Sequence, residues 1–158
     1  MPNWCLNKLT ISHPDPKMME KAVNAWNEGK FLSTLVPEPD YPGYTDCTIK
    51  DGMPDWWEWR VANWGTKWDV GHDPNVGNKG ELHNGEMSVM FDSAWAPPVY
   101  AYDSMTQQGF EITAYYFEPG CDFCGKYSNG EDECYSVSDK NFPEDIDDEM
   151  GISESMQE

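Results

Sequence analysis

The stretch MSVMFDSAW (residues 87–95) decides how this chain folds, because its mostly apolar odd-numbered positions share one face of a β-strand. The following stretch, APPVYAYDSMTQQG (residues 96–109), opens with prolines that the first turn of a helix tolerates and ends in a glycine. The next stretch, FEITAYYF (residues 110–117), is rich in aromatic and β-branched residues, as strands are. The three stretches predict a strand, a helix and a second strand. The first strand is expected to run from Met87 to Trp95, with Trp95 as the last of the residues on its odd-numbered face.

The N-terminal part predicts another strand and another helix. Residues 3–12 alternate, with Cys5, Asn7, Leu9 and Ile11 on one face and Trp4, Leu6, Lys8 and Thr10 on the other. Asp15 suits a helix N-cap, Pro16 suits the first helical position, and Gly29 suits the end of that helix. The apolar face of this helix is expected to consist of Met19, Ala22, Val23 and Trp26.

The middle of the chain predicts an insertion, a short helix and one more strand. Residues 37–54 are rich in Pro and Gly, and we expect an irregular loop there. A helix is expected to begin at Asp55 and to end at Gly65. Residues 66–71 are expected to form a strand, which leads into a polar loop over residues 72–86.

The order of these elements, β-α-β-β-α-β, is that of the ferredoxin-like fold, an α+β two-layer sandwich. Residues 121–138 are expected to add a C-terminal β-hairpin, so that residues 1–138 form one domain. The clustered cysteines that would hold an iron–sulfur cluster are missing from the sequence. The name of the fold therefore describes its topology and not a cofactor.

Residues 139–158 differ in composition from the rest of the chain. They hold eight acidic residues and one Lys. We expect this segment to be a solvated or mobile arm. A weak helical stripe of Ile146, Met150 and Ile152 is the alternative.

The charge of the chain excludes several classes of partner. Among its 158 residues, 29 are acidic and 10 are basic, which gives a formal net charge of -19. Direct binding of nucleic-acid phosphates or of anionic lipid is therefore not expected. The aromatic content of 14% opposes disorder. Residues 1–8 carry no secretory pattern and no apolar run spans a membrane, so we expect a cytoplasmic protein in a bacterial host.

Four short segments carry a resemblance to a known family. They are MPNWCLN (residues 1–7), NWGTKWD (residues 63–69), FDSAWAPP (residues 91–98) and YFEPG (residues 116–120). Together they resemble the YubB-like ferredoxin-like domain family of small phage and plasmid proteins, over roughly residues 1–125. The resemblance implies an α+β domain encoded on a mobile element, and it implies neither a catalytic activity nor a cofactor.

The densest group of aromatic residues is a Trp-rich segment: Trp56, Trp57, Trp59, Trp64 and Trp68. These side chains could fill the space between helix and sheet, which is the more frequent role of buried aromatics. They could also stack a base or anchor a protein partner. Trp57, Val61 and Trp64 share one helical face, which favours packing for those three. Trp56 or Trp59 is then expected to be partly exposed.

The rare cations near this segment offer a second set of candidates. Arg60 and Lys67 could bind a ligand or could pair with nearby carboxylates. Lys67, Asp92 and Trp95 come from the motif segments, as does Asn7, and all four would form one polar site if the strand ends converge. Short polar motifs that fix turns produce the same pattern, and the two interpretations stay open here.

Cys121, Cys124 and Cys134 have spacing like that of metal ligands, but a structural zinc site usually has four. A three-residue hairpin loop, Ser128 to Gly130, would place Cys124 opposite Cys134. A two-residue loop would instead place Cys124 opposite Tyr135. We favour reduced thiols over a cross-strand disulfide, and a disulfide over a metal site.

Two functional hypotheses remain, because no catalytic, phosphate-binding or dinucleotide motif is legible in the sequence. The first is a non-enzymatic accessory protein that binds a basic host or defence protein, in the extreme case as an acidic mimic of nucleic acid. The second is a domain that sequesters a small molecule or nucleotide through the Trp-rich segment. The acidic charge could also serve only solubility.

Overall fold

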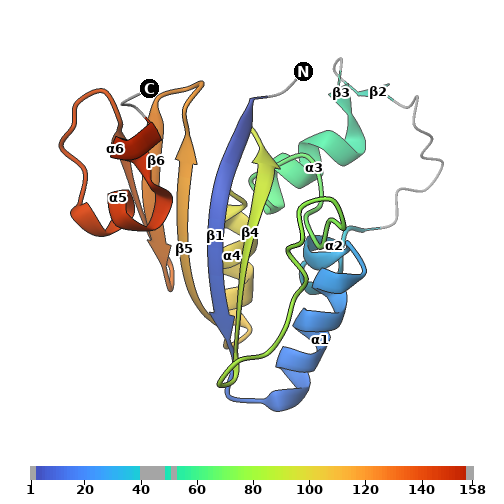
Figure 1. Cartoon of the computed structure of the whole chain (residues 1–158). Coiled ribbons are helices and arrows are strands. Elements are labelled where there is room, and N and C mark those ends of the chain that lie inside the picture. The colour runs from blue at the N-terminus through green and yellow to red at the C-terminus, as the bar shows by residue number, and fades with distance from the viewer. Residues whose placement is uncertain (1–2, 40–48, 51–52, 156–158) are drawn as a thin grey trace.

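A computed structural model describes residues 3–39, 49–50 and 53–155 of the chain. Its main sheet has five strands in the order β4-β1-β5-β6-β7, and every pair of neighbours is antiparallel (Figure 1). The strands of this sheet are β1 (Trp4–Ser12), β4 (Glu86–Ala94), β5 (Glu111–Glu118), β6 (Phe123–Ser128) and β7 (Glu131–Ser136). A separate two-stranded ribbon consists of β2 (Ile49–Lys50) and β3 (Met53–Pro54).

Helices lie on both faces of the main sheet, but they cover the two faces unequally. They are α1 (Pro16–Asn27), α2 (Phe31–Leu35), α3 (Asp55–Asn63), α4 (Val99–Gln107), α5 (Glu144–Met150) and α6 (Ile152–Ser155). The first four belong to the layer that covers one face of the sheet, which we call the inner face. The last two lie on the outer face, in front of β5 and β6 in Figure 1. On the outer face, α5 reaches only the margin of β1, where Glu149 pairs with Lys8; the rest of the outer face of β1 and β4 has no helix over it among the described residues.

The boundaries of α1 follow from local chemistry, as predicted. The Asp15 side chain accepts a hydrogen bond from the Lys17 backbone N–H at 2.9 Å, and Pro16 occupies the first turn. After the helix, Gly29 has a φ of 76°, a conformation that glycine adopts at little cost. The Trp26 indole is fully buried and contacts the rings of Phe31 and Phe91.

The alternation predicted for β1 and β4 is confirmed. Leu9 and Ile11 of β1 and Met87 and Val89 of β4 are buried in the main core beneath α1 and α4. The prediction for Trp95 is wrong, because this residue lies beyond the end of β4. Its φ of 69° takes the chain out of the strand, and its side chain is exposed.

The strand expected over residues 66–71 is not formed, and this segment is a loop. Long-range contacts, rather than the hydrogen bonds of a strand ladder, fix the position of this loop. The Thr66 hydroxyl donates to the Ala94 carbonyl at 2.9 Å, and the Asp69 carboxylate accepts from the backbone N–H groups of Leu32 and Ser33 at 2.6 and 3.1 Å. The α+β class is nevertheless the predicted one, with α1 to α4 forming a layer against one face of the antiparallel sheet; α5 and α6 are an addition on the other face. Much of the insertion predicted over residues 37–54 lies outside the described residues.

The predicted C-terminal hairpin is present, with the two-residue turn. Ser128 pairs with Glu131, so the turn consists of Asn129 and Gly130. Their φ values of 45° and 99° are both positive, as a type I′ turn requires. The Asn129 side chain also accepts the Ile112 backbone N–H at 2.7 Å, which ties the turn to β5.

The prediction of a solvated or mobile arm after residue 138 is wrong for the described part of that segment. Ile146 of α5 and Ile152 of α6 are fully buried against Phe117 and Cys124 of the sheet. The alternative, a short apolar stripe, is the one that forms. Its few apolar side chains suffice because β5 and β6 offer an apolar outer face that needs a cover.

Candidate functional site

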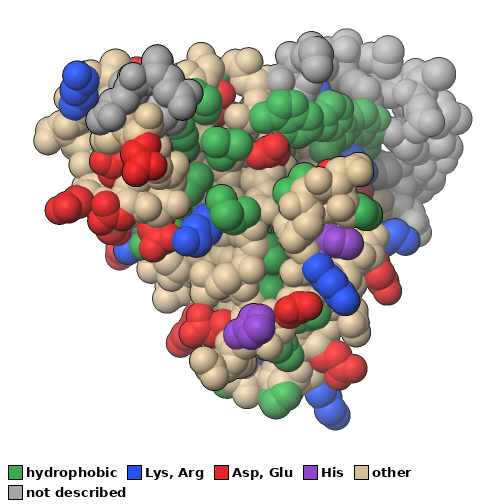
Figure 2. Space-filling model, viewed as in Figure 1, with side chains coloured by type: hydrophobic (Ala, Val, Ile, Leu, Met, Phe, Trp, Pro, Cys, Tyr) green, Lys and Arg blue, Asp and Glu red, His purple; other side chains and the backbone are tan. Residues whose placement is uncertain are grey.

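An exposed apolar surface lies on the outer face of β1 and β4 and on the loops beside it, next to the C-terminal end of α5. Its members and their exposed fractions are Trp4 (42%), Leu6 (39%), Trp68 (39%), Met90 (55%) and Trp95 (42%). Figure 2 shows apolar side chains gathered on this face. Large apolar groups that cluster on a surface, rather than being scattered singly, indicate an interaction site.

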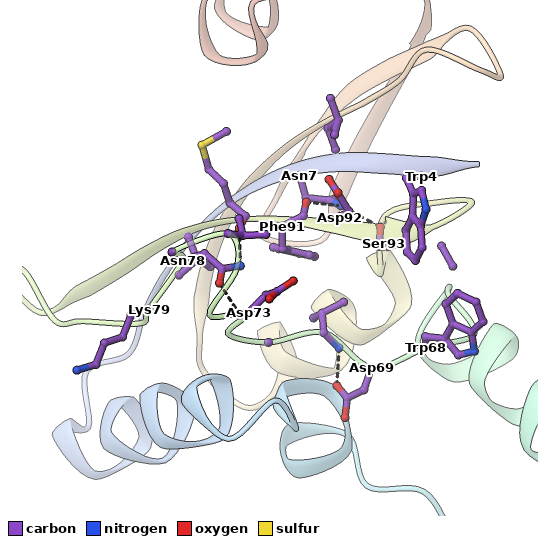
Figure 3. A pocket seen from close by; sticks show the side chains of 18 of the residues that line it. Trp4, Asn7, Trp68, Asp69, Asp73, Asn78, Lys79, Phe91, Asp92 and Ser93 are labelled. Carbon is purple, nitrogen blue, oxygen red and sulfur yellow. Dashed lines mark hydrogen bonds between the residues drawn. The ribbon is translucent and has the colours of Figure 1, made fainter. Parts of the chain in front are cut away.

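A cleft of about 800 Å³ adjoins this surface, between β4 and the loop of residues 68–79 (Figure 3). We call it the edge cleft. At one end Asn78 bridges its two walls, since its side-chain N–H donates to the Met90 carbonyl at 2.9 Å and its side-chain oxygen accepts the Asp73 N–H at 2.7 Å. At the other end the rings of Trp4 and Trp68 lie 5.7 Å apart.

The loop that forms the outer wall is held firmly by α1. The Trp26 indole N–H donates to the Asn78 carbonyl at 2.8 Å, and the Asn27 side chain exchanges two hydrogen bonds with the backbone of Gly80, at 2.8 and 3.0 Å. Gly71 lies so close to the backbone of Gly29 that a β-carbon there would collide with it. The edge cleft is therefore a preformed feature of the fold.

Asp92 is the carboxylate in the edge cleft that is available to a ligand. Its side chain has no hydrogen bond or ion pair within the described part of the chain. Desolvation raises the pKa of this carboxyl above its ordinary value of 3.8. By contrast, both carboxylate oxygens of Asp69 accept backbone N–H groups, and the Asp73 carboxylate accepts the Asn75 N–H.

Lys67 extends the aromatic surface beyond the cleft. Its ammonium lies 4.4 Å from the ring centre of Trp68 and 4.1 Å from that of Trp95. The Trp95 ring in turn lies 6.4 Å from that of Trp57. Cation–π contacts at exposed sites contribute about 0.5–1 kcal/mol each and so favour this arrangement of the rings. Four tryptophans and one lysine thus form a continuous surface from the cleft to α3.

Arg60 lies at the centre of a different cluster, one that stabilises the fold. Its guanidinium donates to both oxygens of Glu38, at 2.8 and 3.0 Å, and to the Lys67 carbonyl at 3.1 Å. It also lies 5.0 Å from the ring centre of Trp56 and 4.9 Å from that of Trp64. Of the two open interpretations of Arg60, pairing with a carboxylate is the one that the structure supports.

The predicted site residues therefore divide into two groups. Lys67, Trp68, Asp92 and Trp95 lie together at the edge cleft and its aromatic surface. Trp64 is fully buried, with its indole N–H bound to the Val36 carbonyl at 2.9 Å, and it cannot touch a partner. The other three, Trp56, Trp59 and Arg60, are half-buried around it.

The sequence interpretation did not place Trp4, Leu6 and Met90 in the site. A signal for them exists, because β1 and β4 carry large apolar residues on both faces at this end. A strand that is apolar on both faces is either covered on both sides or exposes an interaction surface.

Asn7 is a structural residue. It is buried, and its side-chain N–H group donates to the Cys5 carbonyl and to the Ser93 hydroxyl, each at 2.9 Å. Ser93 in turn donates to the Ala96 carbonyl at 2.6 Å. This chain of hydrogen bonds fixes the turn that follows β4, and so positions Trp95.

The described cysteines are free thiols in the structure. The two-residue turn places Cys124 opposite Tyr135 and Cys134 opposite Gly125, so that Cys124 is buried and Cys134 exposed. Burial raises the pKa of Cys124 to about 11 and that of Cys5 well above its usual range, so neither thiol is a nucleophile. Within the described ranges, no three or more His, Cys, Asp or Glu side chains are grouped to hold a metal ion.

Comparisons with known proteins identify a family. Neither the curated proteins nor the solved structures contain a match to this chain. Among the described residues, no helix is long and apolar enough to cross a membrane. One family model, described as the ferredoxin-like domain in Api92-like protein, matches residues 63–154, which is more than half of the chain. That range includes β4, α4, the hairpin and α5, in agreement with the sheet and helices described above. The chain therefore belongs to the family of ferredoxin-like domains in Api92-like proteins.

Proposed function

We propose that this chain is a non-enzymatic accessory protein of a phage or plasmid, and that it acts by binding a basic host or defence protein at the edge cleft. The observation that carries the proposal is the unpartnered Asp92 carboxylate beside the exposed rings of Trp4 and Trp68. An aromatic surface with a carboxylate at its margin fits a lysine or arginine side chain, whose stem packs on the rings while its charge meets the acid.

The composition of the aromatic surface supports a protein partner. Aromatic residues and methionine are enriched at the centres of protein interfaces, and tryptophan is enriched among the residues that dominate binding energy. Rings already fixed by neighbours lose little side-chain entropy on binding. Trp68 and Trp95 meet this condition through Lys67, and Trp4 meets it through Trp68.

The net charge of -19 supports a basic partner over an acidic one. A strongly acidic surface accelerates encounters with a basic surface and repels nucleic acid. A protein that covers the nucleic-acid-binding surface of its partner, as an acidic mimic, is the extreme form of this proposal.

A small molecule is the second candidate, supported by the volume of the edge cleft. About 800 Å³ lies within the usual range for ligand sites. The charged groups that line the cleft are Asp69, Asp73, Lys79 and Asp92, which favour a cationic organic ligand over a nucleotide. Arg60, which a nucleotide phosphate would need, is bound to Glu38.

The proposal is tested with two variants, each of which inverts the charge of one residue, and the two residues lie on opposite edges of the sheet. Immobilised wild-type protein, Asp92→Lys and the control Glu131→Lys, on β7, are incubated with the same host lysate at low and high salt. A basic protein retained by wild type and by Glu131→Lys, but lost with Asp92→Lys, is then purified and its dissociation constant measured for all three. Equal loss with both variants would indicate that only the overall charge matters and would contradict the proposal. Native mass spectrometry of the protein from lysate tests the second candidate, since a bound cation of constant mass would appear there.

A further inference from the structure

The open edge of β4 has a defined pattern of backbone groups. β4 is the terminal strand of the sheet, and among the described residues it pairs with β1 and, at Glu86 alone, with His83. The Trp95 N–H donates to the Asn3 carbonyl at 2.9 Å, so the odd-numbered positions at this end face β1. Hydrogen bonding alternates along an antiparallel strand, so the even-numbered positions of β4 face outward.

Side chains of the neighbouring loop bind two of these outward carbonyls. Asn78 donates to the Met90 carbonyl and Thr66 donates to the Ala94 carbonyl, each at 2.9 Å. Asp92 lies between them and has the same orientation. Its backbone N–H and C=O have no hydrogen-bond partner on this side within the described part of the chain. The edge is thus covered at two points and open at the point where the edge cleft lies.

We propose that the edge cleft binds an extended basic segment of the partner by strand addition, in which the segment pairs with β4 at Asp92. This inference rests on the proposed function and names its mode of recognition. Exposed sheet edges bind extended peptides through backbone hydrogen bonds, while side chains at alternate positions provide specificity. The open Asp92 backbone supplies the hydrogen bonds, and the cleft supplies the space.

The charges of the cleft select a basic segment as the occupant. A residue paired with Asp92 has its side chain on the same sheet face as the Asp92 carboxylate, within reach of it. Two residues away on the segment, the side chain lies beside the exposed Met90. The recognised pattern is therefore a lysine or arginine and an apolar residue separated by one residue of any kind, in an order set by the direction in which the segment runs. A second copy of this chain is disfavoured, because two copies of Asp92 would face each other in a pair of molecules that each carry a charge of -19.

The test uses one synthetic peptide and two methylated forms of it. The probe is acetyl-Thr-Val-Thr-Lys-Thr-Val-Thr-amide with a fluorescent label, and its binding is measured by fluorescence anisotropy. In one form the backbone nitrogens of Val, Lys and Val are methylated, and in the other those of the two inner Thr residues. Strand pairing uses the N–H groups of only one of these sets, whichever direction the segment runs. We expect one form to lose at least tenfold in affinity and the other to bind within about threefold of the parent peptide.

Three results would overturn strand addition: no binding of the parent peptide, equal binding of both methylated forms, or loss of both. If Asp92→Lys still abolishes capture of a basic protein in those cases, the proposed function stands and only its mode is wrong.

A protein-side variant gives an independent readout. Asp92→Pro removes the outward N–H without removing a hydrogen bond to β1, and proline is tolerated at such edge positions. Asp92→Asn removes the same charge and keeps the N–H. With both variants folded by circular dichroism, we expect Asp92→Pro to bind the parent peptide at least tenfold more weakly than Asp92→Asn. Equal affinities would contradict the proposed pairing, and the methylated peptides decide the question if Asp92→Pro does not fold.

Discussion

Arg60, the only arginine of the chain, holds Glu38 through two parallel hydrogen bonds, Nε–Oε2 at 3.0 Å and Nη2–Oε1 at 2.8 Å. This pair joins α3 to the segment that follows α2. The same guanidinium donates to the backbone of Lys67, and so connects the helix to the start of the loop that forms the edge cleft. Only a planar fork can make all of these contacts at once.

Arg60→Lys is expected to destabilise the fold although it keeps the charge. Lysine cannot make the two-point contact with Glu38 and also reach the Lys67 carbonyl. We expect a loss of about 1–2 kcal/mol in the free energy of unfolding, measured by urea denaturation. Lys17→Arg, on the exposed side of α1, is the control and should change the stability by less than about 0.5 kcal/mol. An Arg60→Lys variant as stable as wild type would show that the fork geometry is not needed.

Local chemistry accounts for the parts of the fold that the sequence predicts. The Asp15 cap, the alternation in β1 and β4 and the hairpin depend on neighbouring residues, and all three are present. The strand predicted over residues 66–71 fails because its side chains bond to distant elements, as Asp69 does to α2. Contacts of that length have no signature in a short window of sequence.

The candidate site was partly predictable for the same reason. Lys67, Trp68, Asp92 and Trp95 belong to short motifs, and those motifs do converge. Trp4 joins them only because β1 pairs with β4 and brings its ring to Trp68. Whether this end of the sheet stays uncovered depends on where α5 and α6 pack, and the sequence does not predict their position.

Residues after 138 are expected to stabilise the domain. Ile146→Ala and Ile152→Ala each remove a fully buried side chain from the small core around Phe117. We expect each to cost about 2–4 kcal/mol, measured by thermal and urea denaturation. Asp148→Ala, an exposed position of α5, should change the stability by less than about 0.5 kcal/mol. A chain truncated after residue 138 that melts like the full chain would contradict this assignment.

Gly130→Ala is expected to destabilise the hairpin through the backbone alone. No atom lies within 4 Å of the β-carbon that alanine would add, so packing does not change. The φ of 99° is unfavourable for an L side chain, with a cost of about 1–2 kcal/mol. Glu131→Ala, the next residue, is the control for loss of an exposed side chain. Unfolding experiments on both variants check this, and equal stabilities would show that the turn relaxes to accommodate alanine.

Trp4→Ala and Trp68→Ala are expected to weaken binding while the protein stays folded. Trp4 is 42% and Trp68 39% exposed, so the buried part of each ring, roughly 150 Å², contributes at most about 3 kcal/mol to the fold, and circular dichroism checks that both variants fold. A central aromatic residue of an interface contributes about 2 kcal/mol or more, so binding of the basic partner should weaken at least about 30-fold. Tyr100→Ala on α4 removes an even more exposed aromatic residue elsewhere and should leave the affinity unchanged. If Tyr100→Ala weakens binding as much as Trp4→Ala, the edge cleft is not the binding site.

Asp92 and Asp147 are expected to respond to pH in opposite ways. Desolvation raises the folded-state pKa of Asp92, whereas hydrogen bonds from Ser153 lower that of Asp147. When the folded pKa is the higher one, the folded state binds more protons than the unfolded state, so ionisation costs stability as the pH rises through that pKa. When the folded pKa is the lower one, the carboxylate contributes stability that is lost as the pH falls through it.

Asp92→Asn should therefore make the protein more stable at pH 7, because it removes the penalty of a desolvated charge. The advantage should shrink as the pH falls and vanish below the ordinary aspartate pKa of 3.8, where the wild-type carboxyl is neutral in both states. Asp147→Asn should be less stable than wild type at pH 7 and should approach it in acid. Urea midpoints between pH 3.5 and 7 measure both differences. A residue retained at a cost in stability is typical of a binding site, so an Asp92→Asn variant that is less stable at pH 7 would argue that Asp92 serves the fold and not a partner.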